Sequence, residues 1–205
     1  FIALDGKPYL FCYSKQDKLF GISRIENGTV SYPRPLNIEG DIEFLEMASL
    51  DGGPKTTLVW IEKNEPNYGI KTAPAERIAA AFAVGGEGSI DIESTALAFG
   101  KDADAATAAL KSRPVRVAFA DFNGDGISDA ILYLAYTGKE SLYLGLGQGR
   151  FKELIDEKKI FDEKAGQPLL TRDIDGDGRV DVLYVQNDFM RVLCVDSKNK
   201  LYVDR

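Results

Sequence analysis

The 205-residue chain is 44% hydrophobic, carries a net charge of −7 and contains no histidine. Its size and composition suffice for a packed core, and its acidic balance argues against a nucleic-acid partner, because neutralising phosphates requires clustered Lys and Arg. No stretch approaches the roughly 18 apolar residues of a membrane-spanning helix and no signal peptide is recognisable, so no membrane insertion is expected.

Missing residue types exclude several kinds of active site. Without histidine there can be no Ser-His-Asp triad, Cys-His dyad or His-ligated zinc site. Cys12 and Cys194 each lie in an apolar, strand-like run, which favours buried free thiols over a disulfide or a catalytic thiol. A glycosidase built on paired carboxylates stays open, because a sequence does not show how far apart two acids lie.

The first unit predicts a turn, a strand and a hairpin. The chain begins at Phe1 rather than Met and enters a strand at once, so we expect a processed chain, an excised domain or part of a larger protein. Residues 4–8 (LDGKP) predict a turn before a strand over residues 9–13. A hairpin is then expected over residues 18–30, with Asn27-Gly28 as its turn.

The second unit begins with a related loop that has lost its polar ligands. Residues 48–61 align without gaps on residues 120–133. At the ligand positions of the later loop stand Ser49, Asp51, Gly53 and Thr57. No metal is expected here, and Trp60 on the following strand is predicted to lie in the core. Residues 77–90 are predicted to form the next hairpin, turning at Gly85-Gly86-Glu87-Gly88.

An insertion near residues 94–113 interrupts the repeat. The Ala-rich stretch 102–112 has Asp near its start and Lys near its end, which predicts a short helix ended by Pro114. A tolerated surface loop is one interpretation, and a loop added for contact with a partner is the other.

The third and fourth units each open with one nine-residue pattern, D-x-[ND]-x-D-G-x-x-D, at residues 121–129 (the first loop) and 173–181 (the second loop). Side-chain oxygens at positions one, three, five and nine, with the backbone carbonyl at position seven, are ligands suited to Ca²⁺. The predicted ligands are Asp121, Asn123, Asp125, Asp129 and the carbonyl of Ile127, and then Asp173, Asp175, Asp177, Asp181 and the carbonyl of Arg179. We therefore predict two Ca²⁺ sites.

An EF-hand and a metal-free acidic hairpin are the two alternatives to a strand-flanked calcium loop. An EF-hand needs a Glu at position twelve and flanking helices, whereas position twelve here is Leu132 or Tyr184 within apolar strand-like runs. The other alternative is an acidic hairpin whose Asp and Asn side chains bond only their own backbone. Three or four carboxylates in nine residues repel one another without a cation, and this crowding occurs twice, which favours calcium.

Each loop is followed by a strand and a predicted hairpin, at residues 141–151 and 191–203 for the last two units. The chain thus divides into repeats near 1–40, 41–100, 114–160 and 167–205 within a single domain. Units of about 50 residues, each a small four-stranded antiparallel sheet, predict an all-β fold of about four propeller blades, whole or as part of a larger ring.

The loop and the hairpin SLYLGLGQGRF that follows it resemble the FG-GAP or VCBS repeats of integrin-α-like β-propellers. The resemblance implies a calcium loop between the first two strands of a blade, with the acids and Asn123 named above as ligands, and rings of about seven blades. It is strong over the last two units, and the first two depart from the pattern.

The function expected from these features is a non-enzymatic, calcium-stabilised module that recognises a protein or glycan. A cell-surface, extracellular or periplasmic location is expected, because modules outside cells bind Ca²⁺ at about 10⁻⁴ to 10⁻³ M. The alternatives are a propeller enzyme acting on polysaccharide, or a propeller attached to one. A calcium-driven switch is less favoured, because strand-flanked loops lack the helix pair that sensors move.

Overall fold

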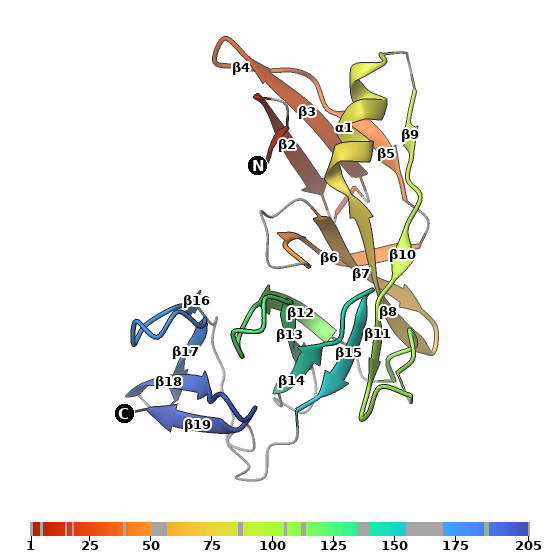
Figure 1. Cartoon of the computed structure of the whole chain (residues 1–205). Coiled ribbons are helices and arrows are strands. Elements are labelled where there is room, and N and C mark those ends of the chain that lie inside the picture. The colour runs from red at the N-terminus through yellow and green to blue at the C-terminus, as the bar shows by residue number, and fades with distance from the viewer. Residues whose placement is uncertain are drawn as a thin grey trace. The chain divides into compact units, whose positions relative to one another are not determined.

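A computed structural model defines the fold, and Figure 1 labels its elements. It describes residues 2–4, 6–14, 16–17, 19–38, 40–50, 57–85, 88–104, 106–111, 114–134, 140–154, 170–186 and 189–204. The chain divides into unit 1 (Phe1–Ala48 and Pro54–Ala96) and unit 2 (Ser49–Gly53 and Leu97–Arg205). Mostly antiparallel sheets make up both units, which confirms the all-β class. Among the described residues, no helix is long and apolar enough to cross a membrane.

The first sheet of unit 1 has the strand order β1-β2-β3-β5-β9, with β4 paired to β3. Its strands are β1 (Ile2–Leu4), β2 (Lys7–Ser14), β3 (Leu19–Glu26), β4 (Thr29–Val30), β5 (Arg34–Asn37) and β9 (Ile90–Asp91). The hairpin predicted over residues 18–30 is confirmed by the pairing of β3 with β4. Asn27 and Gly28 both have positive φ, at 50° and 76°, as a two-residue type I′ turn requires.

The second sheet of unit 1 has the order β10-β8-β7-β6. Its strands are β6 (Asp41–Ala48), β7 (Thr57–Asn64), β8 (Asn67–Pro74) and β10 (Thr95–Ala96). Five consecutive residues of β7 are buried, as expected of a strand covered on both faces. Trp60 on this strand is 1% exposed, so its predicted place in the core is confirmed.

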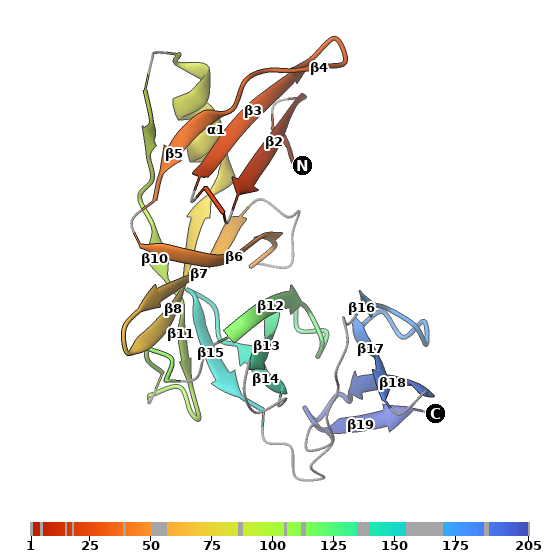
Figure 2. The ribbon, with the colours of Figure 1, turned by 180° about the vertical axis from the view of Figure 1, so that it is seen from behind.

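Helix α1 (Ala75–Ala83) replaces the hairpin that was predicted over residues 77–90, and that prediction is wrong. Alanine is the best helix former, and Ala75, Ile78 and Ala79 place their buried side chains on one helical face. This face packs on the first sheet, in front of β3 and β5 in Figure 1 and behind them in Figure 2. Gly85, at φ 79°, follows the helix C-terminus instead of opening a hairpin turn.

Arg34 of β5 satisfies the carbonyl groups at the end of this helix. Its guanidinium donates to the carbonyl oxygens of Ala81 at 3.5 Å, Gly85 at 3.2 Å and Gly88 at 3.0 Å. The last turn of α1 has no basic residue of its own. A cation from a neighbouring strand therefore supplies the charge that favours a helix C-terminus.

Unit 2 contains the third and fourth sheets, and its strand order explains where the two loops lie. The third sheet has the order β11-β15-β14-β13-β12, and the fourth has the order β16-β17-β18-β19. These strands are β11 (Ala98–Gly100), β12 (Pro114–Ala120), β13 (Asp129–Leu134), β14 (Glu140–Gly145), β15 (Arg150–Glu153), β16 (Leu170–Arg172), β17 (Asp181–Gln186), β18 (Phe189–Val195) and β19 (Leu201–Asp204). Both predicted hairpins are confirmed, by the antiparallel pairs β14–β15 and β18–β19.

The helix predicted over residues 102–112 does not form in the part of that segment that the structure describes. In its described residues, 101–104 and 106–111, the chain forms turns and bends. Thr107 exchanges backbone hydrogen bonds of 2.9 and 3.0 Å with Phe99, so this segment folds back on β11. The Asp102 carboxylate accepts from the Asp104 amide, a local bond that competes with helix formation in so short a segment.

A shared core holds the third and fourth sheets together. Its buried residues are Phe122, Ile131, Leu142, Val182, Tyr184, Leu193, Val195 and Leu201. Phe122 belongs to the first loop and is 1% exposed, so the loop is anchored in this core by its second residue. The stacking of the two sheets thus fixes the strand ends from which the loops extend.

Candidate metal centre

The first loop joins β12 to β13 and is wound around the carboxylate of Asp121. Oδ1 of Asp121 accepts from the amides of Gly124 at 2.7 Å and Asp125 at 3.1 Å, and Oδ2 accepts from the amide of Gly126 at 2.9 Å. Gly126 has a φ of 86°, where a side chain would be strained. The glycine at position six therefore permits the sharp reversal of the chain at this point.

Positions three and five of the first loop are bonded to each other. Asn123 Nδ2 donates to Asp125 Oδ2 at 3.0 Å, and the Asp125 amide donates to Asn123 Oδ1 at 3.1 Å. The other oxygen of Asp125 accepts from the Ile127 amide at 2.8 Å. The Asn123 amide nitrogen therefore faces the Asp125 carboxylate, while the Asn123 oxygen faces the Asp125 backbone amide.

Asp129, at position nine of the first loop, is fully buried. Its oxygens accept from the amides of Phe122 at 3.0 Å and Gly145 at 2.8 Å, which ties the loop to strand β14. Burial raises the pKa of Asp129 to about 7, opposed by the bonds from Gly145 and Phe122 and increased by Asp125 and Asp121. A bound cation would favour the ionised carboxylate instead.

The second loop joins β16 to β17 and repeats these contacts. Asp173 accepts from the amides of Gly176 at 2.7 Å and Gly178 at 3.2 Å. Asp175 Oδ1 accepts from the Asp177 amide at 3.0 Å, and Asp177 Oδ1 accepts from the Arg179 amide at 2.8 Å. Both loops therefore contain the backbone bonds of an acidic turn, and the question is whether their acids also converge.

In the second loop they do converge. One oxygen each from Asp173, Asp175 and Asp177 lies within 4.8 Å of the others. Three exposed carboxylates this close repel one another, and a set of hard oxygen donors suits a hard divalent cation. The residues present therefore fit a metal ion. In the first loop position three is Asn123, and among the described residues its three acids, Asp121, Asp125 and Asp129, do not group at this distance.

Asp181, at position nine of the second loop, lies close to Cys194, which the sequence did not connect to this loop. It is 2% exposed, and one of its oxygens is within 4.8 Å of Asp175 and of the Cys194 sulfur. Burial, and then the hydrogen bond to Asp181, raise the pKa of Cys194 to about 12. The contact follows from the register of β17 with β18, which pairs Val182 with Leu193 and which no pattern in the sequence revealed.

The two cysteines are free, as predicted, with Cys194 buried and Cys12 half-buried. In the related loop that precedes β7, Ser49 is half-buried, and Asp51 and Gly53 fall outside the described residues. The structure therefore does not test the expectation that this loop binds no metal.

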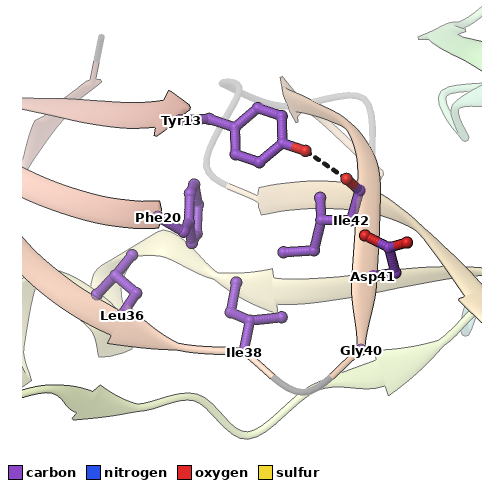
Figure 3. Close-up of a pocket in the computed structure, with 7 residues that line it drawn as sticks. All are labelled: Tyr13, Phe20, Leu36, Ile38, Gly40, Asp41 and Ile42. Carbon is purple, nitrogen blue, oxygen red and sulfur yellow. Dashed lines mark hydrogen bonds between the residues drawn. The ribbon is translucent and has the colours of Figure 1, made fainter. Parts of the chain in front are cut away.

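Unit 1 also contains pockets that are separate from the loops. In Figure 3, the side chains of Phe20, Leu36, Ile38 and Ile42 converge beneath the Tyr13 hydroxyl, which donates to the Ile42 carbonyl. This pocket measures about 50 Å³, well below the 300–1,000 Å³ of typical ligand sites.

A larger pocket of about 250 Å³ lies beside α1. Its lining includes Arg77, Asp91 and Glu93. Arg77 pairs with Glu93 at 3.4 Å, and Asp91 accepts from the Asn37 amide group at 2.9 Å. The side chain of Glu93 is 90% exposed. Two acids unassigned to metal thus share one pocket.

The raised pKa of Asp129 gives a pH-dependence prediction for the calcium-free protein. Because the folded-state pKa lies above the unfolded value, the folded chain binds more protons between about pH 4 and pH 7. Its free energy of unfolding is therefore expected to fall as pH rises through this window, by up to about 4 kcal/mol from Asp129.

Thermal unfolding in chelator from pH 5 to 8 measures this effect, with Asp129→Asn as the variant that does not titrate. The wild-type midpoint is expected to fall relative to the variant as pH rises. If the midpoints of the wild type and of Asp129→Asn changed in parallel with pH, Asp129 would not be a buried carboxylate without a compensating charge.

Comparison with known proteins supplies a family match and a fold likeness. Residues 121–184 match the family described as FG-GAP-like repeat, and this range contains both loops. No curated protein matches the sequence.

Among solved structures, the chain is similar to the periplasmic gluconolactonase PpgL of Pseudomonas aeruginosa, with 17% identity and a TM-score of 0.53. The match covers 100% of this chain and 55% of that chain, so this chain spans about half the length of the gluconolactonase. At this identity the likeness concerns the fold alone. The Tc holotoxin pore of Photorhabdus luminescens matches at 14% identity and a TM-score of 0.36, over 96% of this chain and 12% of that chain, which is too low to carry an argument.

Proposed function

Residues 121–184 of this chain match the FG-GAP-like repeat family, and on that premise we propose that the chain is a non-enzymatic, calcium-stabilised β-propeller module that recognises a protein or glycan. The four sheets would be its blades, within a larger protein. The fold likeness to the gluconolactonase, which extends over this whole chain, supports the proposal at the level of architecture.

The convergence of Asp173, Asp175 and Asp177 is the observation that carries the proposal. It occurs in a loop whose backbone bonds recur in the first loop, within the range that matches the family. The ligands proposed for the second ion are these three acids, Asp181 and the carbonyl of Arg179. Those proposed for the first ion are Asp121, Asn123, Asp125, Asp129 and the carbonyl of Ile127.

The role proposed for the ions is structural. A divalent cation supplies positive charge that offsets the repulsion among the acids of each loop. The chain itself provides rigid support, because Phe122 and Val182 anchor the two loops in the core between the third and fourth sheets. Loops held in this way keep a fixed surface for recognition at that end of the sheets.

A location outside the cytoplasm is part of the proposal. Loops of this exposed kind are expected to bind Ca²⁺ at about 10⁻⁴ to 10⁻³ M, which is useful only where free Ca²⁺ is high. The similar gluconolactonase is described as periplasmic, which agrees with such a location.

Calorimetric Ca²⁺ titration of two single-site variants tests the proposal. Asp125→Ala is expected to remove the first site and Asp177→Ala the second, so each variant binds one ion where the wild type binds two. Asp196→Ala is the matched control, because Asp196 accepts amide bonds from Lys198 and Lys200 in an ordinary turn outside both loops. Equal stoichiometry in all four proteins would overturn the assignment of ligands.

An enzyme acting on polysaccharide is the second candidate, favoured by one observation. Asp91 and Glu93 line the pocket beside α1, and neither belongs to a metal loop. The exposure of Glu93 and its pairing with Arg77 weaken this candidate, because a general acid needs a desolvated carboxyl group. Release of reducing sugar from a glycan panel, lost in Asp91→Asn and Glu93→Gln, would establish the enzyme and displace the recognition module.

A further inference from the structure

The two loops touch each other through their backbones. The Val180 amide of the second loop's end donates to the carbonyl oxygen of Asp121 at 3.1 Å. Asp121 is the first residue of the first loop, and its carboxylate bonds three amides of that loop. One hydrogen bond therefore joins the residue that organises the first loop to the closing segment of the second.

This hydrogen bond also orients a proposed metal ligand. The Val180 N–H and the Arg179 carbonyl belong to a single planar peptide, in which the two groups point in opposite directions. While the N–H is directed at Asp121, the Arg179 carbonyl is directed away from the first loop. The contact thus holds the position-seven carbonyl of the second loop in one orientation.

The side chain of Arg179 makes a second link between the loops. A Cβ added at Gly124, position four of the first loop, would lie 2.9 Å from Cγ and 3.2 Å from Cδ of Arg179. The arginine stem therefore packs on the bare backbone of Gly124. Its guanidinium group pairs with Asp177, at position five of the second loop. Arg179 thus contacts the backbone of one loop and a carboxylate of the other.

We propose that the two loops bind their cations cooperatively, with the Arg179–Val180 segment as the physical link. The inference rests on the proposed function, since it assumes that both loops bind Ca²⁺. Repulsion among the acids of an unneutralised loop favours its loosened form. Loosening either loop disturbs the shared Asp121–Val180 bond and the Arg179 contact, so neutralising one loop favours the ordered form of both.

The expected coupling is about tenfold in affinity, within the usual range for linked sites. It must also be reciprocal. Silencing the first loop with Asp125→Ala is expected to weaken the second about tenfold, and silencing the second with Asp177→Ala is expected to weaken the first by the same factor. Independent sites would show neither change.

Site-resolved titration of the full chain measures both directions. In ¹H–¹⁵N spectra of chelator-stripped protein titrated with Ca²⁺, the Gly126 amide reports on the first loop and the Gly178 amide on the second. Dispersed spectra of each variant show that it is folded. Unchanged affinity of the remaining loop in both variants would overturn the coupling while leaving the two sites intact. Absence of any Ca²⁺ response at both glycines would overturn the proposed function, and the coupling with it.

Two glycines at equivalent loop positions test the route of the coupling. Gly124 and Gly176 both occupy position four with φ of 77° and 80°, but a Cβ at Gly176 meets nothing within 4 Å. Each glycine is changed to Ala in the variant whose own loop no longer binds Ca²⁺. The Ca²⁺ affinity of the other loop is then measured. Adding Gly124→Ala to Asp125→Ala is expected to weaken the second loop a further severalfold. Adding Gly176→Ala to Asp177→Ala is expected to leave the first loop unchanged. Equal effects of the two glycine changes would overturn the role of the Gly124–Arg179 contact.

Discussion

Replacing Gly145 with Ala is expected to lower the free energy of unfolding by about 3 kcal/mol and to abolish calcium binding at the first loop. The added Cβ would lie 2.3 Å from the carbonyl oxygen of Ser128 and 2.8 Å from a methyl group of Ile127. The nearer neighbour is backbone, which cannot rotate away. The strand must therefore shift, and the Gly145 amide would lose its 2.8 Å bond to buried Asp129.

Denaturant unfolding and Ca²⁺ titration of Gly145→Ala measure the two effects. Gly147→Ala, in the turn of the same hairpin, is the control, because a Cβ there meets nothing within 4 Å. It is expected to cost about 1 kcal/mol through its positive φ alone and to keep both sites. A Gly145→Ala protein with two intact sites would show that Asp129 does not depend on β14.

Replacing Trp60 with Ala is expected to destabilise the protein by about 4 kcal/mol without changing calcium binding. Trp60 is 1% exposed and belongs to the core of unit 1 with Leu58, Ala73 and Ile78. Removing so large a side chain leaves a cavity that its neighbours fill only in part. The two loops lie in unit 2, so their ligands are untouched.

Trp60→Phe separates the packing of this side chain from its polar atom. The indole Nε1 is buried and has no hydrogen-bond partner among the described residues, so Phe removes an unsatisfied donor while keeping most of the volume. Trp60→Phe is expected to cost less than about 1.5 kcal/mol by circular dichroism in denaturant. If Trp60→Ala were as mild as Trp60→Phe, the core assignment would be wrong.

The strand-flanked loops could be predicted because their geometry is encoded locally. The spacing of Asp121, Asp125 and Gly126 fixes which amides the first carboxylate can reach, and the structure shows those bonds. The apolar runs after each loop likewise predicted strands β13 and β17, since buried strands have few other compositions.

Helix α1 could not be separated from a hairpin by local pattern alone. The mixture of Ala and larger apolar residues over residues 78–84 fits either element in a short window. The decision depends on contacts distant in sequence, in particular Arg34 at the helix end and the sheet that covers Ile78. In the insertion, the Ala content suggested a helix, but Thr107 instead forms backbone hydrogen bonds with Phe99.

The residues on neighbouring strands that support the loops also could not be predicted from the sequence. Cys194 meets Asp181 only through the register of β17 and β18, and Gly145 meets Asp129 only through the pairing of β13 with β14. The bond from Val180 to Asp121 requires two sheets to stack, which no single repeat encodes.

Thermal unfolding of the chelator-stripped chain across a Ca²⁺ titration, with Mg²⁺ as the control, tests the central claim most directly. The midpoint is expected to rise at submillimolar to millimolar Ca²⁺, by the equivalent of roughly 1.4 kcal/mol per site at ten times the dissociation constant. Mg²⁺ is expected to have a much smaller effect, because it keeps its own waters. A midpoint indifferent to both Ca²⁺ and chelator would contradict the claim and leave the two loops as acidic turns closed by their own backbone bonds.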